Sequence, residues 1–463
     1  MPDWTARDLE MGTRGTWRNA VRRDPAGFSI DTRTLAPGEA FFAITGERFD
    51  GHEFLPQALQ KQAGTLIGSR FPAEALASAT CGCLEVADPL AALQDLARFQ
   101  RARHPAFFLG VTGSNGKTTT KEMLRHLFAG ESETWATPGN LNNHIGLPLN
   151  LVRLPATART AIIEMGMNHA GEIRFLAGIA RPDAALVTNV GPAHIGNLGS
   201  LENIARAKAE ILEGLPDRSF AVVDGESPFL PVFRQATKAL LVTFGFGPGC
   251  DLRGDDLETG PAGTTCRVSW QGREGRLTLG LLGRHNAMNA LAALAMFAAR
   301  GHPLATGLQR LASFQPVGAR MESHEVGGVR VILDCYNANP ASMLEAVEFL
   351  RGCPGRRLAV LGDMKELGDQ SAAFHRQVGE AVARAGLDGL VAVGTDARFL
   401  AEGAMAGGMA ATAVHHCPDT GAAAKLLPGL LAPGSIVLLK ASRGMHFEAI
   451  SRVVFPTLPL DLH

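Results

Sequence analysis

A glycine-rich stretch that follows an apolar run constrains the fold of this chain more than any other feature of its sequence. The apolar run is Phe107-Phe108-Leu109, and the stretch reads Gly110-Val111-Thr112-Gly113-Ser114-Asn115-Gly116-Lys117-Thr118. Residues 121–128 after it are typical of a helix. Glycines let the backbone wrap closely around a phosphate with its N–H groups pointing inward, and a helix N-terminus adds the positive end of a dipole. We therefore expect a strand, a phosphate-binding turn and a helix in this order.

Two side chains of this turn suit a nucleoside triphosphate. In such a loop the lysine, here Lys117, reaches the β- and γ-phosphates, and the hydroxyl, here Thr118, holds Mg²⁺. The spacing departs from the strict G-x-x-x-x-G-K-[ST] pattern, because Val111 stands at the first glycine position and Gly110 falls one place early. The alternative is a glycine-rich turn with an incidental lysine. The strand and helix signals on either side favour the nucleotide site.

The bulk composition is that of an ordinary globular protein. The 463 residues suggest about three domains, and a net charge of −1 gives no overall attraction to nucleic acid or to an anionic membrane. The seven cysteines include no C-x-x-C pair, so reduced thiols in a cytoplasmic protein are expected. No signal-peptide-like or membrane-spanning apolar run occurs in the sequence, and we expect no membrane insertion.

The hydrophobic pattern predicts an α/β fold of three domains. Residues 1–88 indicate a small α/β domain, with a buried strand at 40–44 and a helix at 55–62. Residues 89–316 alternate strands and helices, which indicates a central parallel sheet with crossover helices. Its expected strands are 106–111, 160–164, 184–188, 219–223 and 239–243, an antiparallel hairpin insert is expected within 250–282, and a helix at 285–300.

The remaining residues, 317–463, predict a Rossmann-like, doubly wound sheet. Apolar runs at 329–334, 358–362, 390–394 and 436–440 end in aspartate, glycine or lysine. Helical segments at 343–351 and 374–384 separate some of these runs. In a doubly wound sheet the residues at the carboxyl ends of parallel strands form the ligand-binding crevice.

Polar clusters follow several apolar runs of the central domain. Glu164 closes an expected strand and could bind Mg²⁺, although alone it could be an ordinary edge carboxylate. His194 lies in a strand-to-loop exit and could be structural, a phosphate contact or a metal ligand through its neutral imidazole. Lys208, on an expected helix, is a solvated charge by its own chemistry. The loop at 137–143 carries the carboxamides Asn140, Asn142 and Asn143.

Further clusters lie in the other parts of the chain. Asn286 and Asn289 would share one helix face and could read a purine edge, and Asn286 could equally be an N-cap. Arg320 would be an interdomain arginine suited to the charge of a transferring phosphoryl group. In the first domain a cluster of threonine, aspartate and arginine suits a nucleotide or sugar diphosphate, or else a turn held by side-chain hydrogen bonds. That cluster comprises Asp31, Thr32, Arg33, Thr45 and Gly46.

Together these motifs resemble those of the Mur ligases, ATP-dependent amide-forming enzymes of bacterial cell-wall synthesis. G-x-T-G-S-N-G-K-T at 110–118, T-N-x-G-x-A-H at 188–194 with Ala207-Lys208 after it, and H-N-x-x-N at 285–289 are shared across the family. D-x-Y-N-A-N-P-x-S-M at 334–343, G-D-M-x-E-L-G at 362–368 and the pattern D-T-R…P-G-x-x-F-F-A…D-G-H-x-F across 31–54 point to the member that adds D-alanyl-D-alanine. Thr32 and Ala441 depart from the serine and glycine expected there. No D-N-P-R motif of the diaminopimelate-adding member occurs.

The resemblance implies a reaction with ATP and Mg²⁺. The terminal carboxylate of UDP-MurNAc-tripeptide would become an acyl phosphate, which the amine of D-Ala-D-Ala would attack. The implied catalytic residues are Lys117, Lys208, His194 and Arg320. The implied metal ligands are Thr118 and Glu164 for one Mg²⁺, and Glu164, His194 and a carbamylated Lys208 for a second. A cytoplasmic monomer is the expected state.

The resemblance also distributes the substrates over the three domains. The nucleotide would meet Gly110, Thr112, Gly113, Ser114, Asn115, Gly116, Lys117, Thr118, Thr119, Asn286, Asn289, Arg320 and Asp334. The other substrates would meet Asp31, Thr32, Arg33, Thr45 and Gly46 at the uridine diphosphate end, Asn140, Asn142 and Asn143 in the central domain, and Tyr336 and Asn337 at the dipeptide. Alternatives are another Mur ligase, a ligase like folylpolyglutamate synthase, and a P-loop ATPase that ligates nothing.

Overall fold

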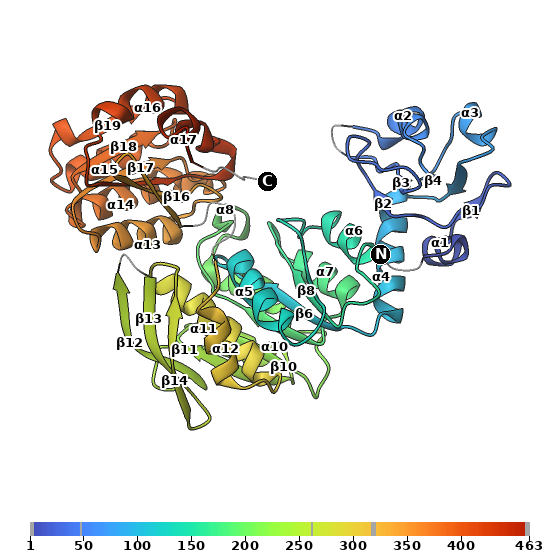
Figure 1. Ribbon diagram of the computed structural model, residues 1–463, viewed down its shortest axis with the longest axis horizontal. Coiled ribbons are helices and arrows are strands. Elements are labelled where there is room, and N and C mark those ends of the chain that lie inside the picture. Colours follow the sequence, from blue (N-terminus) through green and yellow to red (C-terminus); the bar gives the residue numbers. More distant parts are fainter. Residues whose placement is uncertain (1–3, 47–48, 261–262, 316–320, 459–463) are drawn as a thin grey trace.

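The computed structural model describes residues 4–46, 49–260, 263–315 and 321–458, and its chain forms three α/β units (Figure 1). Each unit is built on its own sheet, of five, nine and six strands in chain order. The strands of the three sheets fall within 1–88, 89–316 and 317–463, the ranges expected for the domains. The predicted fold class is confirmed, and the domain boundaries themselves stay predictions.

The first unit is a small, mostly parallel sheet with strand order β1-β5-β4-β3-β2. Its strands are β1 (Thr16–Trp17), β2 (Phe28–Ser29), β3 (Ala40–Phe42), β4 (Thr65–Gly68) and β5 (Gly82–Glu85), and its helices are α1 (Ala6–Thr13), η1 (Gly51–Phe54), α2 (Leu55–Gln60) and α3 (Ala73–Leu76). Trp4 packs edge-on against Phe28 at 5.2 Å and donates a hydrogen bond to the Val152 carbonyl of the central unit at 2.9 Å. The buried core is therefore continuous between these two units.

The central sheet has the order β14-β13-β12-β11-β10-β9-β6-β8-β7, and its strands from β11 to β7 run parallel. Its strands are β6 (Phe107–Thr112), β7 (Thr134–Ala136), β8 (Thr160–Glu164), β9 (Ala184–Val187), β10 (Phe220–Asp224), β11 (Leu240–Gly245), β12 (Leu252–Gly260), β13 (Gly263–Trp270) and β14 (Arg273–Leu279). Its helices are α4 (Pro89–Arg103), α5 (Lys117–Ala129), α6 (Gly146–Val152), α7 (Glu172–Ala180), α8 (Ile195–Leu198), α9 (Leu201–Ala209), α10 (Leu230–Ala236), α11 (Arg284–Ala299) and α12 (Leu304–Leu311). Every strand run expected in this unit coincides with a strand, give or take a residue or two at the ends.

The antiparallel hairpin expected within 250–282 is present, and it continues the central sheet. Strand β12 pairs in parallel with β11, and β13 and β14 follow antiparallel. Alternate residues of this meander, such as Cys266, Val268 and Leu277, are buried and join the core that α11 covers. The predicted antiparallel strands are therefore confirmed, and the structure adds that they extend the central sheet beyond β11, whose edge would otherwise be unpaired.

The third unit has the order β15-β16-β20-β17-β18-β19, with β16 to β19 parallel and β15 antiparallel at one edge. Its strands are β15 (Glu322–Val326), β16 (Val329–Asp334), β17 (Arg356–Gly362), β18 (Gly389–Val393), β19 (Val414–Cys417) and β20 (Ser435–Lys440). Its helices are α13 (Pro340–Arg351), η2 (Gly368–Gln370), α14 (Ser371–Arg384), α15 (Arg398–Ala406), η3 (Ala411–Ala413), α16 (Thr420–Leu426), η4 (Leu427–Gly429), η5 (Arg443–Met445) and α17 (Glu448–Val454). The two edge strands, β15 and β19, carry polar residues and were not expected from the sequence.

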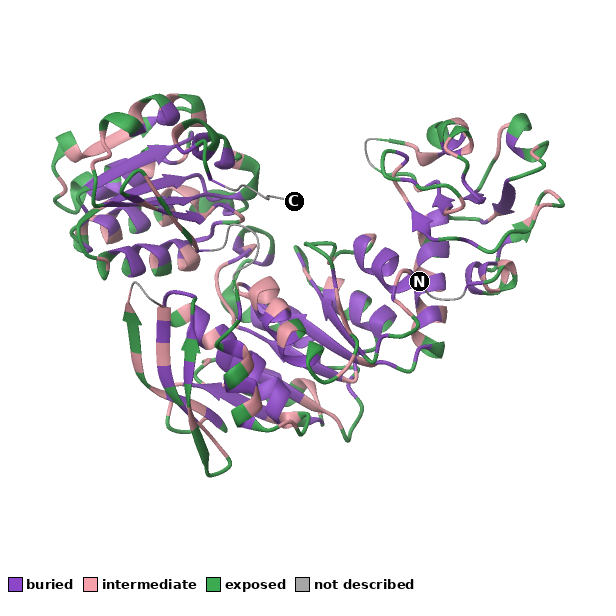
Figure 2. Cartoon of the chain, in the orientation of Figure 1, coloured by how far each residue is buried: buried purple, intermediate pink, exposed green. Residues whose placement is uncertain are grey.

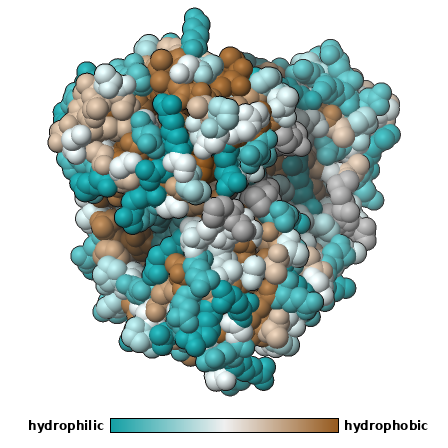
Figure 3. Space-filling view, turned by 60° about the vertical axis from the view of Figure 1, so that its left-hand side comes forward, coloured by the Kyte–Doolittle hydropathy of each residue, from teal (hydrophilic) through white to brown (hydrophobic). Residues whose placement is uncertain are grey.

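Burial follows the layers of each unit. The central strands and α11 are buried almost throughout, and exposed residues lie on outer helix faces and loops (Figure 2). Figure 3 shows the face on which the third and central units meet, with hydrophobic side chains in the recess between them. A cavity of about 570 Å³ there is lined by Met288, Leu344 and Phe349, among others. No helix in the described ranges has the length and apolar character that crossing a membrane requires.

Helices α14 and α15 pack closely because glycines stand at their contact. A side chain at Gly379 of α14 would overlap the carbonyl oxygen of Leu400, and one at Gly403 of α15 would overlap that of Arg376. Backbone atoms cannot move aside as the end of a flexible side chain can. These two glycines therefore set the distance between the helices.

Gly379→Ala should destabilise the third unit by about 1–3 kcal/mol, because the added methyl overpacks the helix contact. The measurement is the position of the calorimetric unfolding transition of the full chain. Gly429→Ala is the control, since a methyl at Gly429 meets no atom within 4 Å. Equal transition temperatures for both variants would contradict the packing account.

Candidate functional site

The glycine-rich stretch forms a tight loop between β6 and α5. Gly113 and Gly116 have φ values of 152° and 75°, and Gly116 is the N-cap residue of α5. A Cβ at Gly113 would overlap Thr188 Oγ1, and one at Gly116 would overlap Asn289 Oδ1. Helix α5 begins at Lys117, four residues before the start expected from the sequence at Lys121. The first turn of the helix is therefore part of the loop and directs its N–H groups toward it.

The loop after β9 fixes the shape of the glycine-rich loop. The Asn115 carbonyl accepts hydrogen bonds from Thr188 Oγ1 at 2.6 Å and from Asn189 Nδ2 at 3.1 Å, and the Asn115 N–H donates to Asn189 Oδ1 at 2.9 Å. Ser114 Oγ donates to the Gly191 carbonyl at 2.9 Å and accepts from the Gly191 N–H at 2.8 Å. Hydrogen bonds thus join two motifs that are far apart in the sequence into one loop structure.

Two residues of the expected nucleotide set face away from the loop. Gly110 lies inside β6, where a side chain would collide with Ile211, so its role is close packing of the sheet. Thr112 ends β6 and is buried, with its hydroxyl donating to the Met165 carbonyl at 2.9 Å. Both residues lie in β6, which extends to Thr112, and the loop starts at Gly113, so their assignment to the nucleotide stays a prediction.

Glu164 is the buried centre of the acidic part of the site. It ends β8, and its carboxylate accepts hydrogen bonds from Thr118 Oγ1 at 2.9 Å and from Asn142 Nδ2 at 2.8 Å. Lys121 Nζ lies 3.6 Å from the same carboxylate and donates to the carbonyls of Thr137 and Gly139 at 2.6 and 3.0 Å. The sequence reasoning did not single out Lys121, which is fully buried. Its position four residues after Lys117 in the helix was the available signal.

The two lysines expected to act in catalysis lie in different surroundings. Lys117 Nζ donates to the carbonyls of Gly113 at 2.9 Å and Ser114 at 3.3 Å, so its side chain folds along the loop. Lys208 lies on the buried face of α9, with 2% of its surface exposed. Burial, and secondarily the charge of Lys117, lower the pKa of Lys208 well below its ordinary value. The sequence reading of a solvated lysine is wrong, because this face of α9 is buried in the core and the helix packs against α7, α8 and α10.

His194 connects the central unit with the third unit. It has a left-handed backbone, with φ of 59°, at the start of α8. Its Nδ1 lies 2.6 Å from a carboxylate oxygen of Glu366 in the loop after β17. The first cause of the lowered pKa of Glu366 is this contact with His194.

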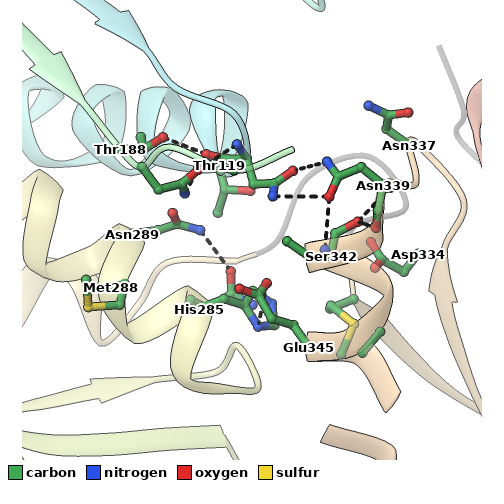
Figure 4. Close-up of a pocket in the computed structure, with 18 of the residues that line it drawn as sticks. Thr119, Thr188, His285, Met288, Asn289, Asp334, Asn337, Asn339, Ser342 and Glu345 are labelled. Carbon is green, nitrogen blue, oxygen red and sulfur yellow. Dashed lines mark hydrogen bonds and ion pairs between the residues drawn. The ribbon is translucent and has the colours of Figure 1, made fainter. Parts of the chain in front are cut away.

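A cavity of about 290 Å³ lies between the glycine-rich loop, the start of α11 and the carboxyl ends of β16 and β20 (Figure 4). Asn286 and Asn289 line it from α11; Asn286 Nδ2 donates to the Leu282 carbonyl at 2.9 Å, and Asn289 Nδ2 to Asn286 Oδ1 at 3.4 Å. The N-cap of α11 is Gly283, so the N-cap alternative for Asn286 is wrong. Expected residues that line this cavity are Asn115, Gly116, Thr119, Asn286, Asn289, Asp334, Tyr336 and Asn337.

The third unit contributes a charged pair and an amide contact to this cavity. Lys440 Nζ lies 2.5 Å from Asp334 and donates to the Asn337 carbonyl at 3.0 Å. Asn339, the N-cap of α13, faces Asn115 of the glycine-rich loop, and their carboxamides approach to 2.5 Å (Figure 4). Lys440 and Asn339 are therefore site residues that the sequence motifs contained but that the reasoning did not assign. Arg320 lies outside the described residues.

A second cavity, of about 720 Å³, opens on the other side of the loop. The expected residues that line it are Ser114, Asn115, Gly116, Lys117, Thr118, Asn140, Asn142, Asn143, Glu164, His194, Tyr336 and Asn337. Tyr336, Asn337, Asn115 and Gly116 line both cavities. The loop therefore lies between two cavities. Residues expected to bind the nucleotide, such as Asn286 and Asn289, line the smaller cavity, and the asparagine loop and Glu164 line the larger one.

The first-unit residues lie apart from both cavities. Arg33 pairs with Asp31 at 2.6 Å, Thr32 Oγ1 donates to Gln57 at 2.7 Å, and Thr45 Oγ1 donates to Asp50 at 3.0 Å. Gly46 donates its N–H to the Phe49 carbonyl at 2.9 Å. The structure thus contains the turn held by side-chain hydrogen bonds that the sequence allowed, and it does not bring this cluster to the loop.

Comparison with known proteins agrees with this arrangement. The chain matches the Mur ligase family, catalytic domain, over residues 26–101, the Mur ligase middle domain over 111–297, and the Mur ligase glutamate ligase domain over 319–443. The chain belongs to the Mur ligase family.

Individual relatives match over almost their whole length. UDP-N-acetylmuramoyl-tripeptide–D-alanyl-D-alanine ligases of Bacillus subtilis and Escherichia coli are 35% and 36% identical to it, over 96% and 92% of this chain and 97% and 93% of theirs. The crystal structure of MurF from Acinetobacter baumannii matches with a TM-score of 0.90 and 32% identity, covering 99% of this chain and 100% of that one. MurF from Thermotoga maritima in complex with ADP matches with a TM-score of 0.82 and 29% identity, covering 92% and 96%. Mycobacterium tuberculosis folylpolyglutamate synthase shares only the fold, at 17% identity and a TM-score of 0.64.

Gly116→Ala should weaken ADP binding on the order of tenfold or more, because a side chain there is strained at positive φ and displaces Asn289. Isothermal titration calorimetry with ADP measures the effect. Gly178→Ala, in α7 with no atom within 4 Å of the added methyl, is the control. Wild-type affinity in Gly116→Ala would show that the loop does not hold the nucleotide.

Proposed function

We propose that this chain joins D-alanyl-D-alanine to UDP-N-acetylmuramoyl-tripeptide with the conversion of ATP to ADP and phosphate. One observation carries the proposal: the glycine-rich loop meets the third-unit motif at 334–343 between two cavities, through the contact of Asn115 with Asn339. Such an arrangement suits a reaction in which a triphosphate, a carboxylate and an amine must be brought together. The relatives with this activity match over more than nine-tenths of the chain.

The reaction we propose has two steps. The terminal carboxylate oxygen of the tripeptide attacks the γ-phosphorus of ATP, the bond to the β-phosphate oxygen breaks, and ADP leaves. The amine of D-alanyl-D-alanine then attacks the acyl phosphate carbon, loses a proton and expels inorganic phosphate. Phosphoryl transfer needs positioning and charge neutralisation more than a covalent nucleophile. Lys117 and the N–H groups of the loop supply both on the nucleotide side.

We assign the magnesium ligands to the acidic part of the site. The described residues contain no cluster of three or more His, Cys, Asp or Glu side chains arranged to hold a metal. Mg²⁺ commonly binds one or two carboxylates and completes its shell with phosphate and water oxygens. Thr118 and Glu164, whose oxygens lie 2.9 Å apart, fit this donor set for a first ion, and Glu164, His194 and Lys208 are assigned to a second. When bound, Mg²⁺ would neutralise phosphate charge.

We propose that Lys208 carries a carbamate. Its burial and lowered pKa favour the neutral amine, whose lone pair can attack the carbon of CO₂. The resulting carbamic acid loses a proton and presents two oxygens in place of an ammonium. Among the described residues no hydrogen bond or ion pair of the Lys208 side-chain amine is found, which leaves this nitrogen available for the reaction.

The remaining roles follow from where each residue lies. We assign adenine to Asn286 and Asn289, and the ribose and phosphates to Asp334, with Arg320 acting on the transferring phosphoryl group. The dipeptide is assigned to Tyr336 and Asn337, and the muramyl substrate to the asparagine loop. The uridine diphosphate end is assigned to the first unit at Asp31, Thr32, Arg33, Thr45 and Gly46.

We propose that the protein works in the cytoplasm as a monomer. Its proposed substrates are nucleotide-linked, and its seven cysteines, all within the described residues, are free. In this proposal the domain at residues 1–88 binds the UDP-sugar, the domain at 89–316 binds ATP, and the domain at 317–463 binds the incoming amine.

The decisive experiment offers the purified chain ATP, Mg²⁺ and UDP-MurNAc-tripeptide with alternative amines. D-Ala-D-Ala should be joined, with one ADP per amide, while glutamate, diaminopimelate and a folate acceptor should not; mass spectrometry identifies the product. Lys117→Ala should lose on the order of a thousandfold in rate. ATP turnover that is independent of both other substrates would refute the ligase and favour a plain ATPase.

Lys208→Ala should lose activity and regain part of it when short carboxylates are added, because a carboxylate can replace the oxygens of the carbamate. The measurement is the ligation rate with and without acetate or formate. Lys425→Ala, at the end of α16, is the control and should respond to neither. A rate of Lys208→Ala that carboxylates leave unchanged would contradict carbamylation.

A further inference from the structure

Two motifs that lie in different units meet at one contact outside the loop described above. T-N-x-G-x-A-H-x-G at 188–196 belongs to the central unit, and G-D-M-x-E-L-G at 362–368 to the third. The contact joins His194 Nδ1 to Glu366 over 2.6 Å. His194 also lines the cavity of about 720 Å³, whereas Glu366 does not. The carboxylate therefore approaches the imidazole from outside the cavity.

The loop that carries Glu366 is held rigidly by its own unit. The Met364 N–H donates to His375 Nε2 at 3.0 Å, and the Lys365 N–H donates to Ser442 Oγ at 3.0 Å. Met364 and Leu367 are buried on either side of Glu366. Glu366 itself has φ of 64°, a left-handed conformation that residues with a side chain rarely adopt. The fold maintains this strained conformation, in which the carboxylate reaches His194.

The two units also touch through backbone at this point. A Cβ at Gly196 would lie 3.2 Å from the Gly368 nitrogen and 3.3 Å from the Glu366 carbonyl oxygen, so a side chain there would push the two backbones apart by a few tenths of an ångström. Helix α8 packs against η2 here. His194 and Glu366 thus stand beside a backbone contact that fixes their separation.

We propose that Glu366 is a positioning residue for His194. The Glu366 oxygen lies 2.6 Å from Nδ1, within reach of its N–H, and a small rotation of either side chain completes the hydrogen bond. Accepting this N–H from the neutral imidazole fixes the tautomer with the lone pair on Nε2. A metal ligand requires this lone pair, and carboxylates behind metal-binding histidines have this effect in other proteins. The inference rests on the proposed function, because it concerns the metal-binding role assigned there to His194.

This positioning links metal binding to the docking of the third unit. Glu366 reaches His194 only when the loop after β17 lies against α8. Any free energy that the docked carboxylate adds to metal binding must equally favour docking when the metal is bound. The acceptor side of the enzyme would thereby help to complete the metal site of the central unit.

The test measures Mn²⁺ binding by electron paramagnetic resonance, with ADP present, in the full-length protein and its variants. Glu366→Gln should weaken the protein-held Mn²⁺ by about 10- to 100-fold, the usual effect of losing such a carboxylate. Glu366→Asp should retain part of the affinity. Gly196→Val, which separates the units without altering the carboxylate, should weaken binding as well. Glu380→Gln, whose partner is the neighbouring Arg384, is the matched control and should bind like wild type.

A second readout follows the imidazole itself. Long-range ¹H–¹⁵N spectra of ¹⁵N-histidine protein distinguish the two neutral tautomers, and His194→Gln identifies the His194 signals. Wild type should show Nδ1–H, and Glu366→Gln a mixture, while thermal unfolding confirms that each variant is folded. Three results would each overturn the inference. Glu366→Gln could bind Mn²⁺ as tightly as wild type does, or its His194 could keep the wild-type tautomer. The wild-type protein could also hold no Mn²⁺ beyond that bound by ADP. Failure of wild type to ligate D-Ala-D-Ala with these effects intact would overturn the proposed function alone.

Discussion

The buried carboxylate of Glu164 is the interaction on which the rest of the site depends. It lies at the end of a central strand, where it accepts from Thr118 and Asn142 and faces the ammonium of Lys121. Removing it would leave the side chains of Thr118 and Asn142 without this acceptor, and Lys121 would keep only Glu122, 3.3 Å away, as a neighbouring carboxylate. The carboxylate thus joins the first turn of α5, the asparagine loop and the sheet into one unit.

The site as a whole is built from strand ends of two sheets. The carboxyl ends of β6, β8 and β9 supply the glycine-rich loop, Glu164 and the loop that clamps it, and those of β16, β17 and β20 supply Asp334, the loop with Glu366 and Lys440. Parallel strands gather their carboxyl ends at one edge of a sheet, so two such edges facing each other bring many polar groups together at little cost in core packing. Contacts such as that of Asn115 with Asn339 form where these edges meet.

The edge strands of the sheets are the part of the fold that could not be predicted from the sequence. Runs such as 160–164 and 329–334 were placed correctly because buried parallel strands are continuously apolar. Strands β15 and β19 were not predicted, because they are half-exposed edge strands. They carry His415, His416 and acidic residues, which form no apolar run. The meander from β12 to β14 alternates clearly enough to be recognised as antiparallel, but its pairing with β11 is a long-range contact that no local pattern encodes.

The sequence by itself determined the order of strands and helices, the phosphate loop and the family, because glycines, apolar runs and motif spacing act locally along the chain. Only the tertiary structure decided that Gly110 and Thr112 serve the sheet, that Lys208 is buried, and that Lys121, Lys440 and Glu366 adjoin the site. The physical reason is that burial, pKa and pairing of a side chain depend on neighbours from distant segments. Those neighbours are in place only when α7, α8 and α10 pack around α9 and when the third unit docks on α8.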